Sequence, residues 1–326
     1  MKRSNFFRAA WAAALGLGLG LGSVQAQTTL RLGHNISATS PYQVGAEAFA
    51  KAVAERTQNR VRVQVFPSGA LGNERDMVEG LQLGTIDFVI SSTAAVGPFV
   101  PALQVLDVPF LFRDYAHSRA VIDGPLGADL SKSVNEKNLV ALAFGEIGFR
   151  QISANKRINA ADDLKGVKLR SQNNPVHLGA WRALGAQPTV VGFNELYAAL
   201  QSGVVDANEQ PISIHAASKF FEVQKHLTLT NHIYGAALLL GSPTALRKLS
   251  PADQDAVRSA AREAVAPMRR AVEAQDASAI ATLRQGGMTI NETFDRGSFE
   301  RALAEYLAGL GQTLGADRLK AIRETR

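Results

Sequence analysis

The chain of 326 residues contains no cysteine. Disulfide bonds, cysteine-ligated metals, a cysteine nucleophile and lipidation at a mature N-terminal cysteine are therefore excluded. Disulfides are dispensable in an exported protein of this length, because about two ordinary domains bury enough apolar surface for stability.

Recognisable catalytic motifs are also lacking. The sequence has no His-Glu-x-x-His, no Gly-x-Ser-x-Gly and no P-loop lysine. Ser153 and Lys156 match Ser-x-x-Lys, but the partner motifs of that signature are missing. The six histidines show no zinc-ligand spacing. We therefore predict no catalytic residue, no cofactor and no metal site, and expect that the chain is not an enzyme.

Long hydrophobic runs are confined to the N-terminus. Lys2, Arg3 and Arg8 precede or flank an apolar run over 9–22, and Ala26 ends a small-residue cleavage pattern. This pattern predicts a signal peptide over 1–26, with a retained N-terminal anchor as the alternative. Without a lipidated cysteine the mature protein is expected to diffuse freely, which requires a second membrane and so indicates the periplasm.

Charge of either sign is modest. The formal net charge is +6, and removal of Lys2, Arg3 and Arg8 with the signal peptide would leave +3. A mildly basic surface attracts anions over long range. It lacks the density of basic residues typical of a nucleic-acid binder, so we expect no nucleic-acid partner.

Hydrophobic periodicity predicts alternating strands and helices. A strand over 29–33, a helix over 42–57 and a strand over 61–66 form a βαβ unit, which favours a parallel sheet. A second unit begins with a strand over 166–170. Capping signals at Ser250 open a long helix that runs toward Gln285.

Two segments resemble each other. Residues 72–87 and 192–206 each combine a Gly-x-Asn or Gly-Asn start, a helix, a glycine stop and a short strand that begins beside an aspartate. Two lobes built on one plan would explain the similarity, and chance likeness of common units is the alternative. No linker rich in Pro, Gly or Ser separates the halves, so the chain is expected to cross between lobes more than once.

A series of motifs in a fixed order resembles one transport family. The chain is similar to the solute-binding (P) subunit of TRAP transporters, the C4-dicarboxylate-binding protein family, over the segments 66–72, 107–112, 148–152, 162–170, 183–189 and 195–211. The likeness extends over essentially the whole mature chain.

The resemblance implies an α/β fold of the two-lobe, type II-like periplasmic binding class, with an interlobe cleft and a long bridging helix. The expected division comprises the signal peptide 1–26, lobe I over 27–148 and 236–275 with the bridging helix, lobe II over 149–235, and C-terminal helices over 276–326 that pack mainly on lobe II.

The resemblance also implies ligand-binding residues on lobe II. The family arginine that pairs with the ligand carboxylate corresponds to Arg170, and a second arginine that reaches it corresponds to Arg150. The guanidinium fork matches a carboxylate with two parallel hydrogen bonds. Glu209 either contacts ligand or orients an arginine. Gln210 stands where the family has an asparagine, and keeps an amide with one more methylene.

Three cleft positions on lobe I match Asn35, Glu74 and Ser92. Some sialic-acid-binding relatives have an acidic residue at the position of Ser92, so its absence here argues against sialate. Together with Gln210, these side chains suit hydroxyl groups better than a second carboxylate, which favours a sugar acid such as a uronate. The aromatic residues Trp181, Phe193, Phe220 and Phe221 are expected in the core.

The predicted function is capture of an organic acid through an arginine–carboxylate salt bridge, closure around it, and delivery to the small and large membrane subunits of a TRAP permease. The protein is expected to be a monomer. The alternatives are a C4-dicarboxylate or 2-oxo acid binding protein, and a sensor-coupled periplasmic receptor on the same scaffold.

Overall fold

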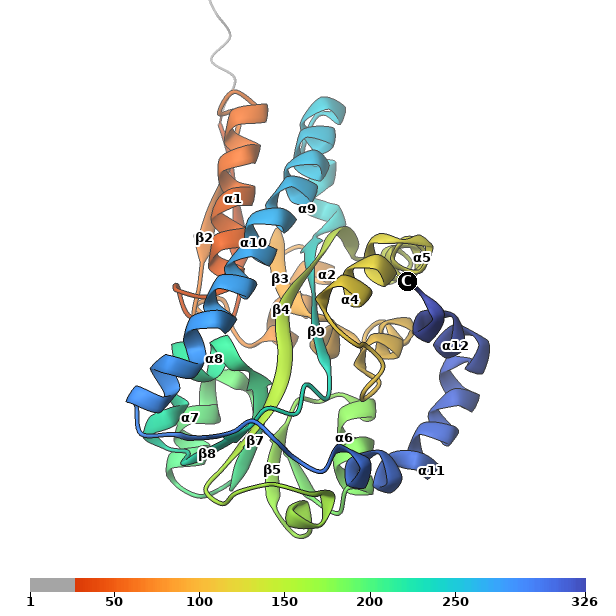
Figure 1. The fold of residues 1–326 in the computed structure, drawn as a ribbon. Coiled ribbons are helices and arrows are strands. Elements are labelled where there is room, and N and C mark those ends of the chain that lie inside the picture. The colour runs from red at the N-terminus through yellow and green to blue at the C-terminus, as the bar shows by residue number, and fades with distance from the viewer. Residues whose placement is uncertain (1–26) are drawn as a thin grey trace, which may run out of the picture.

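The longest strand, β4 (Val140–Ala154), runs through both halves of the molecule in the computed structural model, which describes residues 27–326 (Figure 1). Residues 140–149 pair antiparallel with β9 (Tyr234–Gly241), and residues 150–154 pair antiparallel with β7 (Ala207–Pro211). One strand thus joins two lobes, in the sheet order β2-β1-β3-β9-β4-β7-β5-β6. This continuity explains why no flexible linker occurs in the sequence.

The first lobe contains the predicted N-terminal βαβ unit. Strands β1 (Thr28–Gly33) and β2 (Val61–Phe66) are parallel, and β1 also pairs parallel with β3 (Phe88–Ser92). Ser40 caps the helix α1 (Pro41–Arg56) by accepting a hydrogen bond from the backbone of Gln43. The other helices of this lobe are α2 (Glu74–Leu83), α3 (Thr93–Val96), η1 (Pro101–Asp107), α4 (Tyr115–Asp123), α5 (Pro125–Asn135) and α9 (Pro243–Arg247).

The second lobe repeats this plan on a smaller scale. Strand β5 (Lys168–Ser171) is parallel to β6 (Gln187–Val190) and to β7. Asn174 caps α6 (Pro175–Ala183) through the backbone amides of its first turn. The remaining elements are η2 (Ala161–Leu164), α7 (Phe193–Gln201), α8 (Ile212–Ala217), η3 (Phe220–Glu222), β8 (His226–Thr228) and β10 (Thr289–Asn291).

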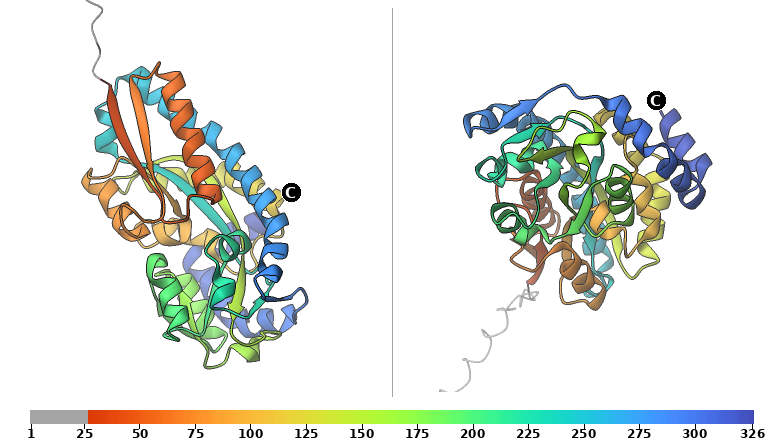
Figure 2. Two further views of the ribbon diagram at one scale, coloured as in Figure 1. Left: turned by 90° about the vertical axis from the view of Figure 1, so that its left-hand side faces the viewer. Right: turned by 90° about the horizontal axis from the view of Figure 1, so that it is seen from below.

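A single long helix, α10 (Pro251–Gln285), spans the two lobes, which confirms the predicted bridging helix (Figures 1 and 2). It packs against α1 in the first lobe, along β4, and against α8 in the second. Helix α11 (Arg296–Leu314) then packs on α6.

The last helix, α12 (Ala316–Glu324), was not expected from the sequence. It returns to the first lobe, where Leu319 and Ile322 join the buried core and the Ile322 carbonyl contacts His117 Nε2 at 2.7 Å. The lobe boundaries stay a prediction, and the predicted signal peptide lies outside the described residues.

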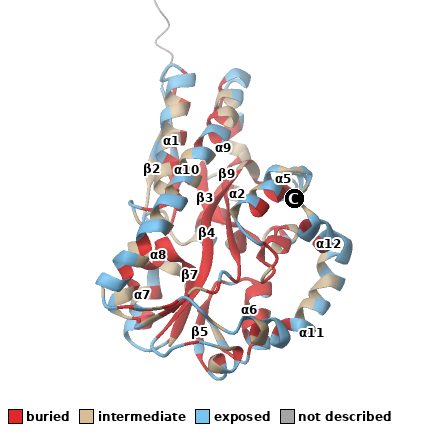
Figure 3. Cartoon of the chain, viewed as in Figure 1, coloured by how far each residue is buried: buried red, intermediate tan, exposed pale blue. Residues whose placement is uncertain are grey.

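Burial follows the strands that run through the centre of the molecule. Figure 3 shows β4 and β9 as buried throughout most of their length, with exposed residues on the outer helix faces. Strands covered on both faces are expected to be continuously apolar, as the residues 234–241 are. None of the helices within 27–326 is both long and apolar enough to cross a bilayer.

We predict that Gly235→Ala lowers the free energy of unfolding. Gly235 of β9 pairs with Gly148 of β4 close to the point where β4 passes between the lobes, and an added Cβ would lie 2.6 Å from the carbonyl oxygen of Gly148. Backbone atoms cannot move aside cheaply, so the loss should be about 1–3 kcal/mol in urea denaturation.

The matched control is Gly309→Ala on the exposed surface of α11, where an added Cβ meets no atom within 4 Å. This variant should keep or gain stability, by up to about 1 kcal/mol, because alanine favours helix. Equal effects of the two substitutions would contradict the close approach of β9 to β4 at Gly235.

Candidate functional site

A cavity of about 260 Å³ lies between the lobes. Its wall is formed where β1, β5 and β6 end and where α2 and α7 begin, the usual place for a ligand in an α/β sheet. The side chains that line it include Asn35, Glu74, Arg75, Phe99, Arg170, Gln172 and Phe193.

Arg170 is a buried cation with unused hydrogen-bonding capacity. Its Nε donates to the Val191 carbonyl at 2.9 Å, which holds the guanidinium at the carboxyl end of β5. Its Nη1 is buried and has no hydrogen-bond partner among the described residues. Burial lowers the pKa of Arg170 to about 10, with the nearby Glu209 opposing this change. The group therefore stays charged at neutral pH and presents a desolvated positive charge to the cavity.

Arg150 and Glu209 form a buried ion pair behind this wall. Arg150 Nε donates to Glu209 Oε2, and Nη2 donates to Glu209 Oε1 at 3.0 Å and to its carbonyl at 2.7 Å. The two side chains are 3% and 0% exposed. Because three hydrogen bonds join the two residues, Glu209 is placed to orient the Arg150 guanidinium.

Two histidines surround the same carboxylate. His232 Nε2 lies 3.4 Å from Glu209 Oε2, and His177 Nδ1 lies 3.9 Å from Oε1. His177 Nε2 also lies 3.6 Å from Asp107 of the first lobe. Burial alone would raise the pKa of Glu209, but Arg150 and these neighbours hold it well below its usual range. Among residues 27–326 no cluster of side chains has the arrangement of a metal site.

On the first lobe, Glu74 gathers three donors at one carboxylate oxygen. Its Oε1 accepts from the Ser92 backbone at 2.8 Å and from the Ser91 and Ser92 hydroxyls at 3.0 Å. The second oxygen is left for other partners. Asn35 also lines the cavity, and its buried Oδ1 has no partner among the described residues. Acceptors of this kind can bind hydroxyl groups.

The structure brings some predicted site residues to the cavity and leaves others behind it. Asn35, Glu74 and Arg170 line the wall, and Ser92 lies directly behind Glu74. Three further predicted residues, Arg150, Glu209 and Gln210, are not among the lining residues.

Gln210 pairs with Gln151 in the β4–β7 ladder. Successive side chains in a strand point to opposite faces, so Gln210 faces away from the side on which Glu209 meets Arg150.

Several lining residues were not singled out from the sequence. Phe193 packs against the core, as expected, and also lines the cavity at the start of α7, as does Phe99 of the first lobe. Arg75 is a second cation at the rim, where its Nε donates to Glu79 at 2.9 Å. Gln172 lies two residues after Arg170, and this position at the end of a strand is the one feature of the sequence that could have predicted its place in the cavity wall.

The lobes touch across the mouth of the cavity. Asn73 Nδ2 donates to Glu195 at 3.3 Å, and the backbone amide of Asn194 donates to Asn73 Oδ1 at 3.4 Å. These residues belong to the two similar segments found in the sequence, whose helices begin on opposite sides of the cavity. The structure is therefore a closed form of the two-lobe fold.

Comparison with known proteins gives consistent matches along the chain. The profile of the bacterial extracellular solute-binding protein family 7 matches residues 32–311. The 2,3-diketo-L-gulonate-binding periplasmic protein YiaO of Escherichia coli K12 is 35% identical over 305 residues, which cover 92% of this chain and 93% of the relative.

Solved structures share the fold as well as the sequence. A TRAP periplasmic solute-binding protein of Polaromonas sp. JS666 bound to D-erythronate has a TM-score of 0.90 at 43% identity, covering 92% of this chain and 99% of that one. A homologous protein of Sulfurospirillum deleyianum with bound succinate has a TM-score of 0.88 at 32% identity, covering 92% and 100%. The likeness thus includes both lobes.

We predict that Glu209→Gln makes stability less sensitive to acid. The pKa of Glu209 is depressed from 4.5 in the folded protein, so its ionised form stabilises the fold above about pH 5 and this contribution is lost as the pH falls further. The wild type should lose stability below about pH 5 more steeply than the variant. At pH 7 the variant should be less stable by about 3–5 kcal/mol, because Arg150 loses its buried partner.

Urea denaturation at a series of pH values measures both effects. Glu300→Gln is the control, since its ion pair with Arg296 lies on the surface, with about half of each side chain exposed. Parallel pH curves for the wild type and Glu209→Gln would show that Glu209 has no such role.

Proposed function

We propose that this chain, which belongs to bacterial extracellular solute-binding protein family 7, captures a small hydroxylated monocarboxylate, a sugar acid. The observation that carries the proposal is the buried Arg170 guanidinium, which lines the interlobe cavity and whose Nη1 has no partner among the described residues. A carboxylate would supply the missing acceptor and charge.

The cavity supports a small ligand. Its volume of about 260 Å³ is below the range of roughly 300–1,000 Å³ common for drug-sized ligands. Phe99 and Phe193 provide apolar walls, while Asn35 and Glu74 provide hydrogen-bonding groups. This combination suits a short carbon chain with a carboxylate at one end and hydroxyl groups along its length.

A sugar acid is favoured over a dicarboxylate by the charges opposite Arg170. Glu74 would repel a second carboxylate, whereas its free oxygen can accept a hydroxyl donor. The more similar of the relatives named above bind 2,3-diketo-L-gulonate and D-erythronate, both sugar acids.

Arg75 supports the alternative ligand, a dicarboxylate such as the succinate bound by the Sulfurospirillum protein. This second cation is 62% exposed and already paired with Glu79, so it offers a weak second clamp.

The further steps of transport follow from the family. We propose export by the signal peptide over 1–26, a monomeric receptor in the periplasm, and delivery of the acid to the small and large membrane subunits of a TRAP permease. We also retain Arg150 as a second carboxylate-binding residue, because Glu209 binds only its Nε and Nη2, and its Nη1 contacts only the neutral oxygen of Gln172.

A thermal-shift screen tests the ligand class. D-erythronate, D-glucuronate, galactonate, succinate and a 2-oxo acid are compared at equal concentration, because a tight ligand raises the melting temperature by mass action. The proposal requires the largest shift from a hydroxylated monocarboxylate. A larger shift with succinate would assign the site to dicarboxylates instead.

We predict that Arg170→Ala weakens binding of D-erythronate by roughly 30-fold or more in calorimetry, because removing one partner of a buried charge pair typically costs about 2–5 kcal/mol. Arg75→Ala is the matched control. It should change D-erythronate binding less than about threefold, since exposed ion pairs contribute about 0–1 kcal/mol. A loss below tenfold for Arg170→Ala would reject this residue as the anchor.

A further inference from the structure

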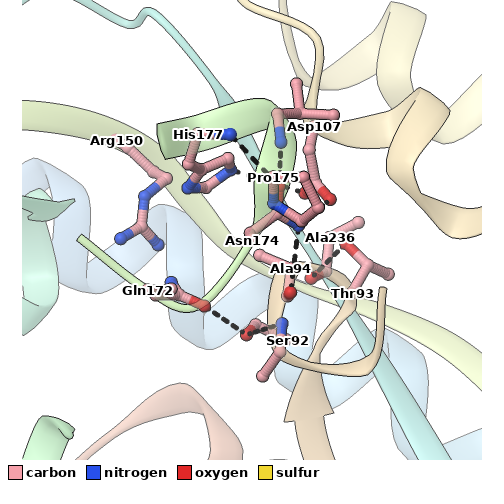
Figure 4. A network of polar contacts seen from close by, with 12 residues as sticks. Ser92, Thr93, Ala94, Asp107, Arg150, Gln172, Asn174, Pro175, His177 and Ala236 are labelled. Carbon is pink, nitrogen blue, oxygen red and sulfur yellow. Dashed lines mark hydrogen bonds and ion pairs between the residues drawn. The ribbon is translucent and has the colours of Figure 1, made fainter. Parts of the chain in front are cut away.

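Gln172 lies at the junction of the two lobes, and the proposed function gives it no role. It follows β5, two residues after Arg170, and is 8% exposed at the cavity wall. Figure 4 shows its side chain between Arg150 of the second lobe and Ser92 of the first. A buried amide in this place must satisfy both its donor and its acceptor atoms.

The hydrogen-bond network determines which way the amide points. With its oxygen toward Arg150, Gln172 accepts from Nη2 at 3.1 Å and Nη1 at 3.2 Å, and its nitrogen donates to Ser92 Oγ at 3.1 Å. The reverse orientation would set amide hydrogens against guanidinium hydrogens. Arg150 is thus held on one side by Glu209 and on the other by a neutral oxygen.

The same direction of donation continues into the first lobe. Ser92 Oγ donates to Glu74 Oε1 at 3.0 Å. A relay of four side chains therefore runs from a cation to an anion, Arg150 to Gln172 to Ser92 to Glu74, and each member donates to the next. Such aligned chains strengthen one another in a low-dielectric environment.

The relay crosses between lobes at the Gln172–Ser92 bond. Arg150 and Gln172 belong to the second lobe, and Ser92 and Glu74 to the first. Asn174 makes a neighbouring crossing, donating to the Ala94 carbonyl at 3.0 Å and to Asp107 at 2.8 Å (Figure 4). Separation of the lobes must break the Gln172–Ser92 bond, after which Arg150 alone holds the Gln172 amide.

We propose that Gln172 is a positioning residue that couples closure of the lobes to the arrangement of the carboxylate-binding arginines. In the closed form it fixes Arg150 through a neutral oxygen, so the positive charge of Arg150 and Arg170 remains available to an anion. A carboxylate at this position would neutralise part of that charge. The inference rests on the proposed function, and makes Gln172 a determinant of how long a bound acid is retained.

Binding kinetics test this role with D-erythronate as the probe. Gln172→Leu keeps the approximate volume but removes both hydrogen-bonding roles. We expect its D-erythronate dissociation rate to rise about tenfold with the association rate within about twofold of wild type, since lost closed-state contacts act mainly on dissociation. Gln172→Glu should weaken binding further, by about 100-fold, because it adds an anion beside the ligand carboxylate.

Two more variants isolate the relay. Ser92→Ala should raise the dissociation rate similarly. The double variant Ser92→Ala/Gln172→Leu should dissociate little faster than Gln172→Leu alone, because both substitutions remove the same Gln172–Ser92 hydrogen bond. Gln104→Leu is the control, since the Gln104 amide donates to Gly97 within the first lobe. An unchanged dissociation rate in Gln172→Leu, or fully additive effects in the double variant, would overturn the inference.

A ligand-free measurement separates this inference from the proposed function. The absence of cysteine allows spin labels at two introduced cysteines, Leu83→Cys and Val204→Cys, which replace residues 78% and 56% exposed on opposite lobes. Pulsed electron spin resonance should show a longer mean distance in Gln172→Leu than in the otherwise identical labelled protein. Failure of the wild type to bind any acid would reject the proposed function alone, while identical distance distributions would reject the role of Gln172.

Discussion

The buried pair of Arg150 and Glu209 is the interaction on which the site depends. It joins β4 to β7 at the point where β4 passes from one lobe into the other. A buried ion pair contributes little net stability, but breaking it leaves an uncompensated charge, which is far more costly. The pair therefore constrains the strands and the guanidinium together. His177, between Glu209 and Asp107, extends this constraint toward the first lobe.

The buried side chains around this ion pair carry an excess of positive charge on the second-lobe side of the cavity. Arg150 and Arg170 are both buried, and the desolvation that lowers the pKa of Arg170 is only partly offset by Glu209. Glu74 stands across the cavity, held by three donors of its own lobe. In the proposed complex, a carboxylate beside Arg170 would complete the balance on one side, and hydroxyl groups would meet Glu74 on the other. Closure of the lobes strengthens both interactions because it removes water.

Much of the fold could be predicted because its signals are local. The alternation over 61–66, the cap at Ser250 and the family motif ending in Arg170 each lie within a short stretch of chain, and the corresponding strand, helix and cavity residue are present. The short helix α12 was missed because its placement depends on contacts with the distant helix α4. The role of Phe193 in the cavity wall was missed because a partly buried aromatic residue can belong to a core and to a cavity wall at once.

The sequence by itself determined the α/β class and the two-lobe plan, and its resemblance to the family led to the proposal of Arg170 as the carboxylate anchor, since these follow from periodicity, spacing or an ordered series of motifs. Only the tertiary structure decided which polar groups meet. Ser92 and Gln172 are 80 residues apart in the chain, and Arg150 and Glu209 are 59 apart. No periodicity links residues at such separations, because their contact depends on how two lobes and a shared strand pack together. The division between residues that line the cavity and residues that hold them in place is therefore a property of packing.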